Sequence, residues 1–565
     1  MIRSSLFAGA LITSLASFGA GADLQVWTVQ DTRHVLREDP AGASTGVKLA
    51  AARNEWESFQ VLLRSTSPAG EVNVEPGTFK AADGSTLDGA RVVLYRQHQL
   101  QLTERSARND QFRPGWYPDP LIPAVHPMTG KPLEAARFTA AGFDLPAQQT
   151  HGYLVDVYVP PVAKAGTYRA VCRVTARGVK AAEIPVELTV WDFELPQFSA
   201  FQTALGSPGD RLRGYYRKRA KQGKEKEPAD WDAVDAQIAQ LLSDHRINAS
   251  PPAGSLTPVA QPDGKYQIPA EQVARFREFV DRYHVNAYDI PHPRTAIKDP
   301  EVEQEKLRAW LASWNQAAKE LDRPQVVFYT YLLDEPNDEE AYRFVQKWGR
   351  AIRAAKSVVK VLVVEQTLTQ SPAWGDLNGA VDIWCPLFCL HDPKTAAERQ
   401  ALGETIWTYT ALCQGKKPSP WWQIDFPLLN YRVPMWIAWR YRMRGLLYWG
   451  GMSYWSGVDD PWTDPKTLDR RTKGKGPLYN GEGNLLYPAR AVGYDGITPS
   501  LRLKALRDGI EDYEYLANLE RLGRAAQAEK VVLPQAASWF DWEADPAAYG
   551  KARVKLAEMI LGGTP

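Results

Sequence analysis

The first part of the chain, up to about Pro196, alternates apolar and polar positions in short stretches. Examples are ESFQVLLRS at 57–65 and IPVELTVWDFELP at 184–196, with Gly, Pro, Asn and Asp between such stretches. A repeat of two residues is typical of a strand with one buried and one exposed face. The pattern predicts an antiparallel β-sandwich over residues 23–197. The Pro-rich stretch 108–123 is expected to be irregular, either as a wall against the next domain or as a long connection.

After Pro196 the pattern changes to apolar runs that alternate with helical periods. In residues 301–321 the apolar side chains Leu307, Trp310, Leu311 and Trp314 recur at three- and four-residue spacing, which predicts a helix with one buried face. The strand-like runs number eight and are 201–205, 246–249, 284–290, 326–333, 361–365, 381–385, 406–410 and 445–449. Eight strands alternating with helices predict a (β/α)8 barrel, a TIM-like fold, over residues 198–500. Residues 501–565 read as helices packed on the barrel.

The order of residue types in residues 1–22 suggests a signal for export. One Arg is followed by an apolar stretch and then by Ala20-Gly21-Ala22, which is typical of a signal peptide with its cleavage site. We expect a mature chain from Asp23 in the periplasm or outside the cell, and the sequence favours neither. No later stretch is both long enough and sufficiently uncharged to span a membrane.

Composition narrows the classes of partner. The 565 residues have a formal net charge of +1 and are 24% charged, so no basic field is present for nucleic acid. Twenty Trp and 24 Tyr suit stacking on sugar rings, although aromatic residues also fill cores. The spacing of the four cysteines, Cys172, Cys385, Cys389 and Cys413, with His391 favours buried thiols or one disulfide over a zinc site. We expect no metal and, because cofactor motifs are absent, no cofactor.

Two adjacent acids, Asp334 and Glu335, follow the fourth strand-like run. Catalytic groups of such barrels lie at the C-terminal ends of strands, and these acids precede Pro336 and the expected helix cap Asn337. The alternative is that they only decorate a helix N-terminus. Neighbouring residues cannot stand on opposite faces of a sugar in the usual two-carboxylate arrangement. They suit a substrate-assisted route, in which the 2-acetamido oxygen of the sugar attacks the anomeric carbon.

The adjacent acids belong to a longer resemblance. The motifs ARNEWESFQVLL, WYPDPLIP, YLLDEP, RGLLYWGGMSYW, GEGNLLYP and LRLKALRDGIEDYEYL resemble glycoside hydrolase family 123 and the related domain of unknown function 4091. The resemblance covers nearly the whole mature chain. It implies β-N-acetylgalactosaminidase-type hydrolysis of a glycan, with Asp334 orienting the acetamido group and Glu335 as general acid. It leaves open the sugar configuration, terminal or internal cleavage, and the oligomeric state.

Candidate binding residues lie near strand ends, although each one alone also suits a core position. They are Tyr331, expected to hydrogen-bond the acetamido oxygen, with Asp382, Trp384, Trp407, Tyr409, Trp449, Tyr454 and Trp455. The segment 448–465 is either a lid or subsite loop or a disordered stretch. His245 is interpreted as structural, on the opposite face of the barrel.

Two alternative functions remain. An ordinary retaining glycosidase would use Glu335 with Glu365, which ends the fifth strand-like run, and would need their carboxyl groups about 5 to 5.5 Å apart. A non-catalytic glycan-binding protein would keep the barrel only as a platform.

Overall fold

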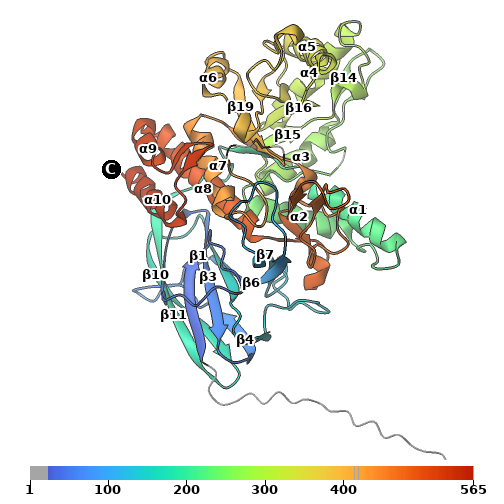
Figure 1. The fold of residues 1–565 in the computed structure, drawn as a ribbon. Helices are drawn as coiled ribbons and strands as arrows, with labels where there is room; N and C mark the ends of the chain where they lie inside the picture. Colours follow the sequence, from blue (N-terminus) through green and yellow to red (C-terminus); the bar gives the residue numbers. More distant parts are fainter. Residues whose placement is uncertain (1–22, 253, 413, 416, 418, 564–565) are drawn as a thin grey trace, which may run out of the picture.

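The computed structural model describes residues 23–252, 254–412, 414–415, 417 and 419–563 (Figure 1). The predicted signal peptide and Cys413 lie outside these residues. None of the helices in the described ranges is long and apolar enough to cross a membrane.

The N-terminal part forms two sheets that share an apolar core. The first has the order β1-β3-β9-β6-β7, with bounds Leu24–Gln30, Glu55–Ser65, His151–Val159, Arg91–Leu102 and Gly115–Pro123. The second has the order β2-β11-β10-β4-β8, with bounds Val47–Arg53, Val179–Glu194, Gly166–Ala176, Ala69–Glu75 and Phe143–Leu145, and β5 (Lys80–Ala81) pairs with β10. Phe59 and Val61 of β3 share this core with Val186 and Leu188 of β11. The expectation of purely antiparallel pairing is wrong at one edge, because β2 runs parallel to β11.

The Pro-rich stretch is partly regular, contrary to the prediction. Its second half forms β7, which pairs antiparallel with β6 across a bulge between Gln97 and Gln99. β7 is an edge strand, where a proline costs no ladder hydrogen bond on the open side. Pro120 makes an isolated bridge with Ser500, so the stretch does pack as a wall against the C-terminal region.

The second part is a nearly closed barrel of parallel strands. Within the described residues it has seven strands in the order β12-β20-β19-β18-β17-β16-β15. Their bounds are Gln202–Ala204, Gly445–Tyr448, Thr405–Thr410, Ile383–Trp384, Lys360–Val364, Val327–Asp334 and Ala287–Asp289. The predicted strand at 246–249 is absent from this sheet, so the expectation of eight strands is wrong.

An asparagine pair occupies the place of the missing strand. Asn248 donates from its backbone to Thr203 Oγ1 at 2.8 Å and from its side chain to Thr203 O at 2.9 Å. Its Oδ1 accepts from the Asn286 backbone at 2.9 Å. The segment is short: Arg246 has a left-handed φ of 57° just after a helix, and Pro251 follows closely without an N–H to donate. Side-chain hydrogen bonds therefore link β12 to β15 where a ladder was expected.

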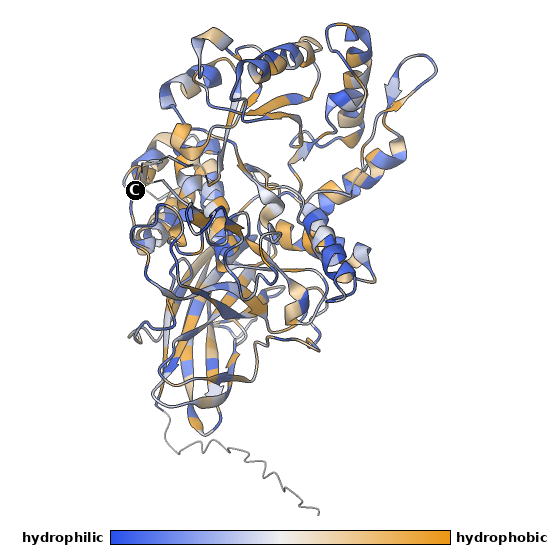
Figure 2. Cartoon of the chain, turned by 45° about the vertical axis from the view of Figure 1, so that its right-hand side comes forward, coloured by the Kyte–Doolittle hydropathy of each residue, from blue (hydrophilic) through white to orange (hydrophobic). Residues whose placement is uncertain are grey.

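Helices surround the barrel and supply their apolar faces to its outer layer (Figures 1 and 2). They are α1 (Pro208–Lys221), α2 (Trp231–Asp244), α3 (Ala270–Tyr283), α4 (Gln304–Leu321), α5 (Glu339–Ala354), α6 (Pro393–Ala401) and α7 (Leu429–Arg440). Short pieces are η1 (Pro293–Thr295), η2 (Pro372–Trp374), η3 (Phe388–Leu390), η4 (Gly450–Met452) and η5 (Ala489–Val492). Minor strand pairs are β13/β14 (Val259–Ala260, Tyr266–Gln267), β21/β22 (Leu468–Asp469, Leu478–Tyr479), β23/β24 (Leu486–Pro488, Ile497–Pro499) and β25/β26 (Ala536–Ser538, Asp541–Trp542).

The C-terminal helices are α8 (Leu501–Arg521), α9 (Ala525–Val532) and α10 (Pro546–Ile560). α8 is buried along nearly its whole length between the barrel and the first sheet, and it does not merely cover the outside of the barrel. Its cations pair with acids of that sheet: Arg502 with Asp119 at 2.8 Å, and Arg507 with Asp156 at 2.9 Å. Removing one member of such a buried pair costs about 3 to 5 kcal/mol, because the other charge stays buried and unpaired. These pairs fix the N-terminal sheets against the barrel.

Candidate active site

A bulge in β16 brings two site residues to the same side of the strand. The register with β17 shifts between Tyr331 and Leu333, so one extra residue is inserted there. Leu332 and Leu333 both pack toward the outer core, whereas Tyr331 faces the barrel interior. Strict alternation would send Asp334 outward, three residues after Tyr331. With the bulge, Tyr331 and Asp334 face the same cavity, and their oxygens lie 2.9 Å apart.

The next residue, Glu335, has a left-handed backbone with φ of 42°. A non-glycine residue in this region is strained, and such strain concentrates at functional sites. The turn ends the alternation of the strand, and both Asp334 and Glu335 line one cavity of about 820 Å³. The cap of α5 is Asp338, which accepts from the Ala341 backbone at 2.8 Å, so the expected cap Asn337 is wrong. Both acids still precede the cap.

Separate tyrosines hold the two carboxylates. The Tyr331 hydroxyl donates to Asp334 Oδ1, and burial raises the pKa of Tyr331 far above its ordinary value. The hydroxyl of Tyr409, near the end of β19, donates to Glu335 Oε1 at 2.5 Å. Each tyrosine thus fixes one carboxylate. The prediction placed both tyrosines in the pocket, where they do line the cavity, but it assigned the Tyr331 hydroxyl to a sugar group.

A third acid in the cavity, Asp289, was missed from the sequence. It ends β15, and its Oδ1 accepts the Tyr331 backbone N–H at 3.1 Å. Although the residue is open to the cavity, desolvation by the surrounding protein raises the pKa of its carboxyl to about 7. The signal that selected Asp334 was also present here, since Asp289 is an acid close to the end of a strand-like run.

Loops from distant parts of the chain complete the cavity wall. Residues 249–252, which follow the missing strand, lie on one side, and Trp449 with 450–451 lies on another. The indole N–H of Trp449, one of the candidate binding residues, donates to Glu482 at 2.7 Å, which fixes its ring at the cavity. Arg211 and Arg470 bring two guanidinium groups that the sequence analysis did not select. Part of the segment 448–465 therefore forms cavity wall.

Two predicted binding residues face away from the cavity. The Trp384 side chain packs in the outer core and donates to Glu404 at 2.7 Å. Asp382 precedes β18, where it accepts from the Val361 backbone at 2.9 Å and pairs with Arg353 at 3.3 Å. Asp382 thus lies at the N-terminal end of the strands, opposite the site. Both predictions are wrong, because residues 382 and 384 take the outward face of this strand and 383 and 385 the inward one.

Three further predicted aromatics lie near the cavity without lining it. Trp407 is buried in the barrel interior, with its ring 5.2 Å from that of Tyr329. Tyr454 and Trp455 line a neighbouring hollow beside α1. The aromatic lining of the cavity therefore differs from the predicted one, because Tyr288, Tyr329 and Tyr448 line it and were not selected from the sequence.

The alternative partner Glu365 is not among the residues that line the cavity. Its two oxygens accept from the Gln366 backbone at 3.0 Å and the Gln370 side chain at 2.8 Å. Burial raises its pKa to about 7, with a smaller contribution from the charge of Glu335. The carboxyl is thus occupied by its own loop.

The remaining titratable candidates have structural surroundings. His245 is buried at the end of α2, its Nδ1 lies 2.6 Å from Leu241 O, and burial lowers its pKa well below the ordinary value. Cys172 and Cys385 are buried thiols. Across the described ranges, His, Cys, Asp and Glu side chains form no group of three or more that could hold a metal.

Comparison with known proteins gives the family of this site. Residues 295–519 match the model of the catalytic domain of glycoside hydrolase 123, a range that contains Asp334, Glu335 and Tyr409. A family 123 glycoside hydrolase from Clostridium perfringens, described for glycolipid glycan hydrolysis, has a similar fold with TM-score 0.62 and 13% identity over 95% of this chain and 97% of that one.

A β-galactosidase-like protein from Bacteroides fragilis matches at TM-score 0.28 and 12% identity over 82% of this chain and 59% of that one, too weakly to carry an argument. A search of curated proteins gave no match. The chain carries a glycoside hydrolase family 123 catalytic domain and is a glycoside hydrolase.

Proposed function

We propose that this protein is exported and that it cleaves β-linked 2-acetamido sugars of the N-acetylgalactosamine type by a substrate-assisted, retaining mechanism. The observation that carries the proposal is the pair of sequence neighbours Asp334 and Glu335 in one cavity, each bound by its own tyrosine. Two carboxylates so close in the chain can act on the same face of the sugar, one on the acetamido group and the other on the departing oxygen.

In this mechanism the acetamido oxygen attacks the anomeric carbon while the glycosidic bond breaks. Asp334 accepts the acetamido N–H and stabilises the positive charge that develops on the cyclised group, which is the electrostatic role of a preorganised acceptor. Glu335 gives its proton to the departing oxygen. Glu335 then takes a proton from water, which opens the cyclic intermediate and restores the original configuration.

The hydrogen bonds of the site support these separate roles. Tyr331 occupies Asp334 Oδ1, and Oδ2 has no donor among the described residues, which leaves it for the acetamido N–H. Tyr409 orients Glu335 from the neighbouring side of the barrel. The engagement of Glu365 by its own loop weighs against the ordinary retaining route.

The cavity volume of about 820 Å³ suits a sugar with part of its neighbour, because ligand pockets range over about 300 to 1,000 Å³. The family resemblance implies an N-acetylgalactosamine-type substrate, and hydrolysis of matched galacto and gluco substrates decides the configuration. The glycolipid glycan named for the Clostridium perfringens relative supports a glycoconjugate as the natural substrate.

The test is hydrolysis of nitrophenyl β-N-acetylgalactosaminide beside its N-acetylglucosamine and plain galactose counterparts. We expect cleavage of the acetamido sugars only, with the galacto form preferred. A thiazoline that resembles the cyclised intermediate should inhibit, because it resembles a species that the site stabilises. Efficient cleavage of the plain galactoside would exclude substrate assistance.

Two variants separate the roles of the acids. Glu335→Gln should still release a leaving group that departs without a proton, as a burst followed by slower turnover because the second step lacks its base, and should lose turnover of alkyl glycosides. Asp334→Asn should lose turnover of both, because the attack itself is weakened. Equal behaviour of the two variants on both substrate types would contradict the assignment.

A further inference from the structure

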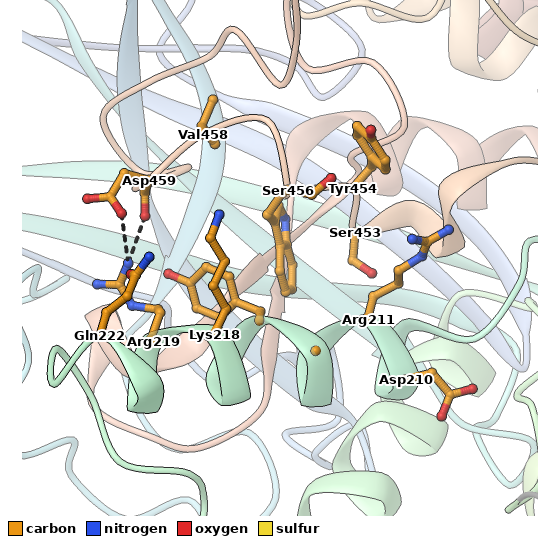
Figure 3. A pocket seen from close by; sticks show the side chains of 13 residues that line it. Asp210, Arg211, Lys218, Arg219, Gln222, Ser453, Tyr454, Ser456, Val458 and Asp459 are labelled. Carbon is orange, nitrogen blue, oxygen red and sulfur yellow. Dashed lines mark hydrogen bonds and ion pairs between the residues drawn. The ribbon is translucent and has the colours of Figure 1, made fainter.

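A smaller hollow adjoins the catalytic cavity along α1. It has a volume of about 220 Å³ and lies between one face of α1 and the segment 453–459 (Figure 3). Asp210 and Arg211 line both the hollow and the catalytic cavity, so the two spaces meet at the first turn of α1. A glycan bound at Asp334 and Glu335 can extend into this hollow.

Aromatic rings form one wall of the hollow. Trp455 is buried, and its indole N–H donates to Asn484 Oδ1 and to Leu486 O, both at 2.9 Å. The Tyr215 ring meets it edge-on at 5.3 Å. The half-buried Tyr215 ring, fixed against the buried Trp455, gives a rigid apolar surface that suits the face of a sugar ring.

Two cations of α1 reach toward the same hollow. Arg211 and Lys218 are seven residues apart on one helix face, a rise of about 10.5 Å. Both rise from the helix on the side of segment 453–459, whereas Asp210 points away (Figure 3). Neither cation has an ion pair with any described residue, and Arg211 only approaches the Tyr454 ring, at 5.9 Å.

Other cations nearby are already paired, which sets these two apart. Arg213 pairs with Asp235 at 2.6 Å, and Arg219 with Glu225 at 2.5 Å. Of the two acids that line the hollow, Asp210 points away from it (Figure 3), and Asp459 is held by Lys224 at 2.6 Å. An exposed cation on a helix is ordinarily just solvated, but here two cations without an ion pair to a described residue face a hollow joined to the site. In the catalytic cavity, Arg470 likewise has no ion pair among the described residues.

We propose that this hollow is a subsite for an acidic sugar unit, next to the 2-acetamido sugar, whose carboxylate or sulfate is bound by Arg211 and Lys218. The sugar ring lies against the half-buried Tyr215, whose ring packs edge-on against the buried Trp455, and the guanidinium of Arg211 offers paired donors to the planar or tetrahedral anion. The inference rests on the proposed function, because the 2-acetamido sugar occupies the catalytic cavity. It adds a substrate class, namely acidic glycans.

The test compares three disaccharides in which N-acetylgalactosamine is β-linked to glucose, to glucuronic acid or to glucose sulfate. We expect kcat/KM to be about tenfold or more higher for an acidic disaccharide than for the neutral one, with the advantage reduced by added salt because ion contacts are screened. The preferred acidic disaccharide distinguishes a carboxylate from a sulfate. Equal kcat/KM for all three would overturn the proposal.

Variants assign the effect to the hollow. Lys218→Gln should remove the advantage of the acidic disaccharides while cleavage of the neutral one and of the nitrophenyl glycoside stays unchanged, because Lys218 lines the hollow and not the catalytic cavity. Arg211→Gln, which alters the catalytic cavity as well, should lower the ratio of kcat/KM for the acidic to that for the neutral disaccharide. Lys221→Gln, on the same helix outside the hollow, is the matched control and should keep the advantage. An equal loss on neutral and acidic substrates would also overturn the proposal.

Failure of the proposed function has a different signature. If the nitrophenyl glycoside is not cleaved, binding of the same disaccharides to the unaltered protein and to Arg211→Gln is measured by calorimetry. Tighter binding of the acidic disaccharides, lost in Arg211→Gln, supports the subsite independently of turnover. Binding that does not depend on charge overturns it.

Discussion

Tyr409 at the end of β19 donates its hydroxyl proton to Glu335 at the end of β16, with the oxygens 2.5 Å apart. The two residues are 74 positions apart in the chain, and only closure of the parallel sheet brings these strand ends to one cavity. Because Glu335 itself has a strained left-handed backbone, this bond helps to fix where its carboxyl lies.

Tyr409→Phe should therefore lower kcat with little change in KM. A hydrogen bond to a charged group contributes about 1.5 to 3 kcal/mol, which corresponds to about ten- to a hundredfold in rate. Steady-state kinetics on nitrophenyl and alkyl N-acetylgalactosaminides should show the larger loss on the alkyl substrates, which need protonation. Tyr513→Phe is the control, because its hydroxyl bonds Met443 O behind the barrel, and its activity should be retained.

Glu365→Gln should leave turnover within about threefold of the unaltered enzyme. A catalytic nucleophile would lose many orders of magnitude on such a change, as removal of a triad member does in proteases. The Glu365 oxygens accept bonds from their own loop and lie outside the cavity wall. Steady-state kinetics on the same N-acetylgalactosaminides test this prediction. A loss of turnover above a thousandfold would favour the ordinary retaining mechanism.

The sequence predicted the acid pair because Asp334 and Glu335 close an apolar run at the end of a strand. It could not predict how both acids reach one cavity. The bulge at Leu332 and the left-handed backbone of Glu335 leave no pattern in hydrophobic spacing, since the flanking residues are apolar on both faces.

The same two-sided burial explains the wrong assignments. In the run VDIWC, Ile383 and Trp384 are both apolar, so alternation does not reveal that Ile383 faces the interior and Trp384 the helices. The run at 246–249 has strand-like residues, but the left-handed Arg246 and the prolines after it prevent a ladder. Arg211 was missed because it comes from the first turn of a helix, far along the chain from the acid pair.

Trp384→Phe and Trp449→Phe should affect different properties, because Trp384 lies in the core and Trp449 in the cavity wall. Trp384→Phe removes the hydrogen bond to Glu404 and should lower the melting temperature while KM is unchanged. Trp449→Phe alters a cavity wall ring that Glu482 positions and should raise KM several-fold, because a sugar loses part of its stacking surface. Thermal unfolding and kinetics on the same preparations test both, and a KM increase in Trp384→Phe would contradict the outward placement.

The buried charges between the first sheet and the C-terminal helices should make stability highest in mildly acidic solution. Burial raises the pKa of Glu55 and Glu511 to about 7 and that of Glu57 to about 8, although Arg553 and Arg507 act in the opposite direction. In the unfolded chain these carboxyls have pKa values near about 4.3. The native state thus holds more protons between about pH 4.3 and pH 8, so the free energy of unfolding falls as pH rises through that range.

At the acid end the sign reverses. Burial alone would raise the pKa of Asp156, but Arg507 and Lys504 hold it well below its ordinary value, so its contribution is lost as pH falls below about 4. Melting temperature measured from pH 3 to pH 8.5 should therefore peak near about pH 4. Glu57→Gln, which keeps a polar side chain but cannot ionise, should flatten the decline toward pH 8, whereas Glu183→Gln, an exposed partner of Arg173, should not. A melting temperature that rises steadily to pH 8 would show that the ion pairs outweigh burial at this interface.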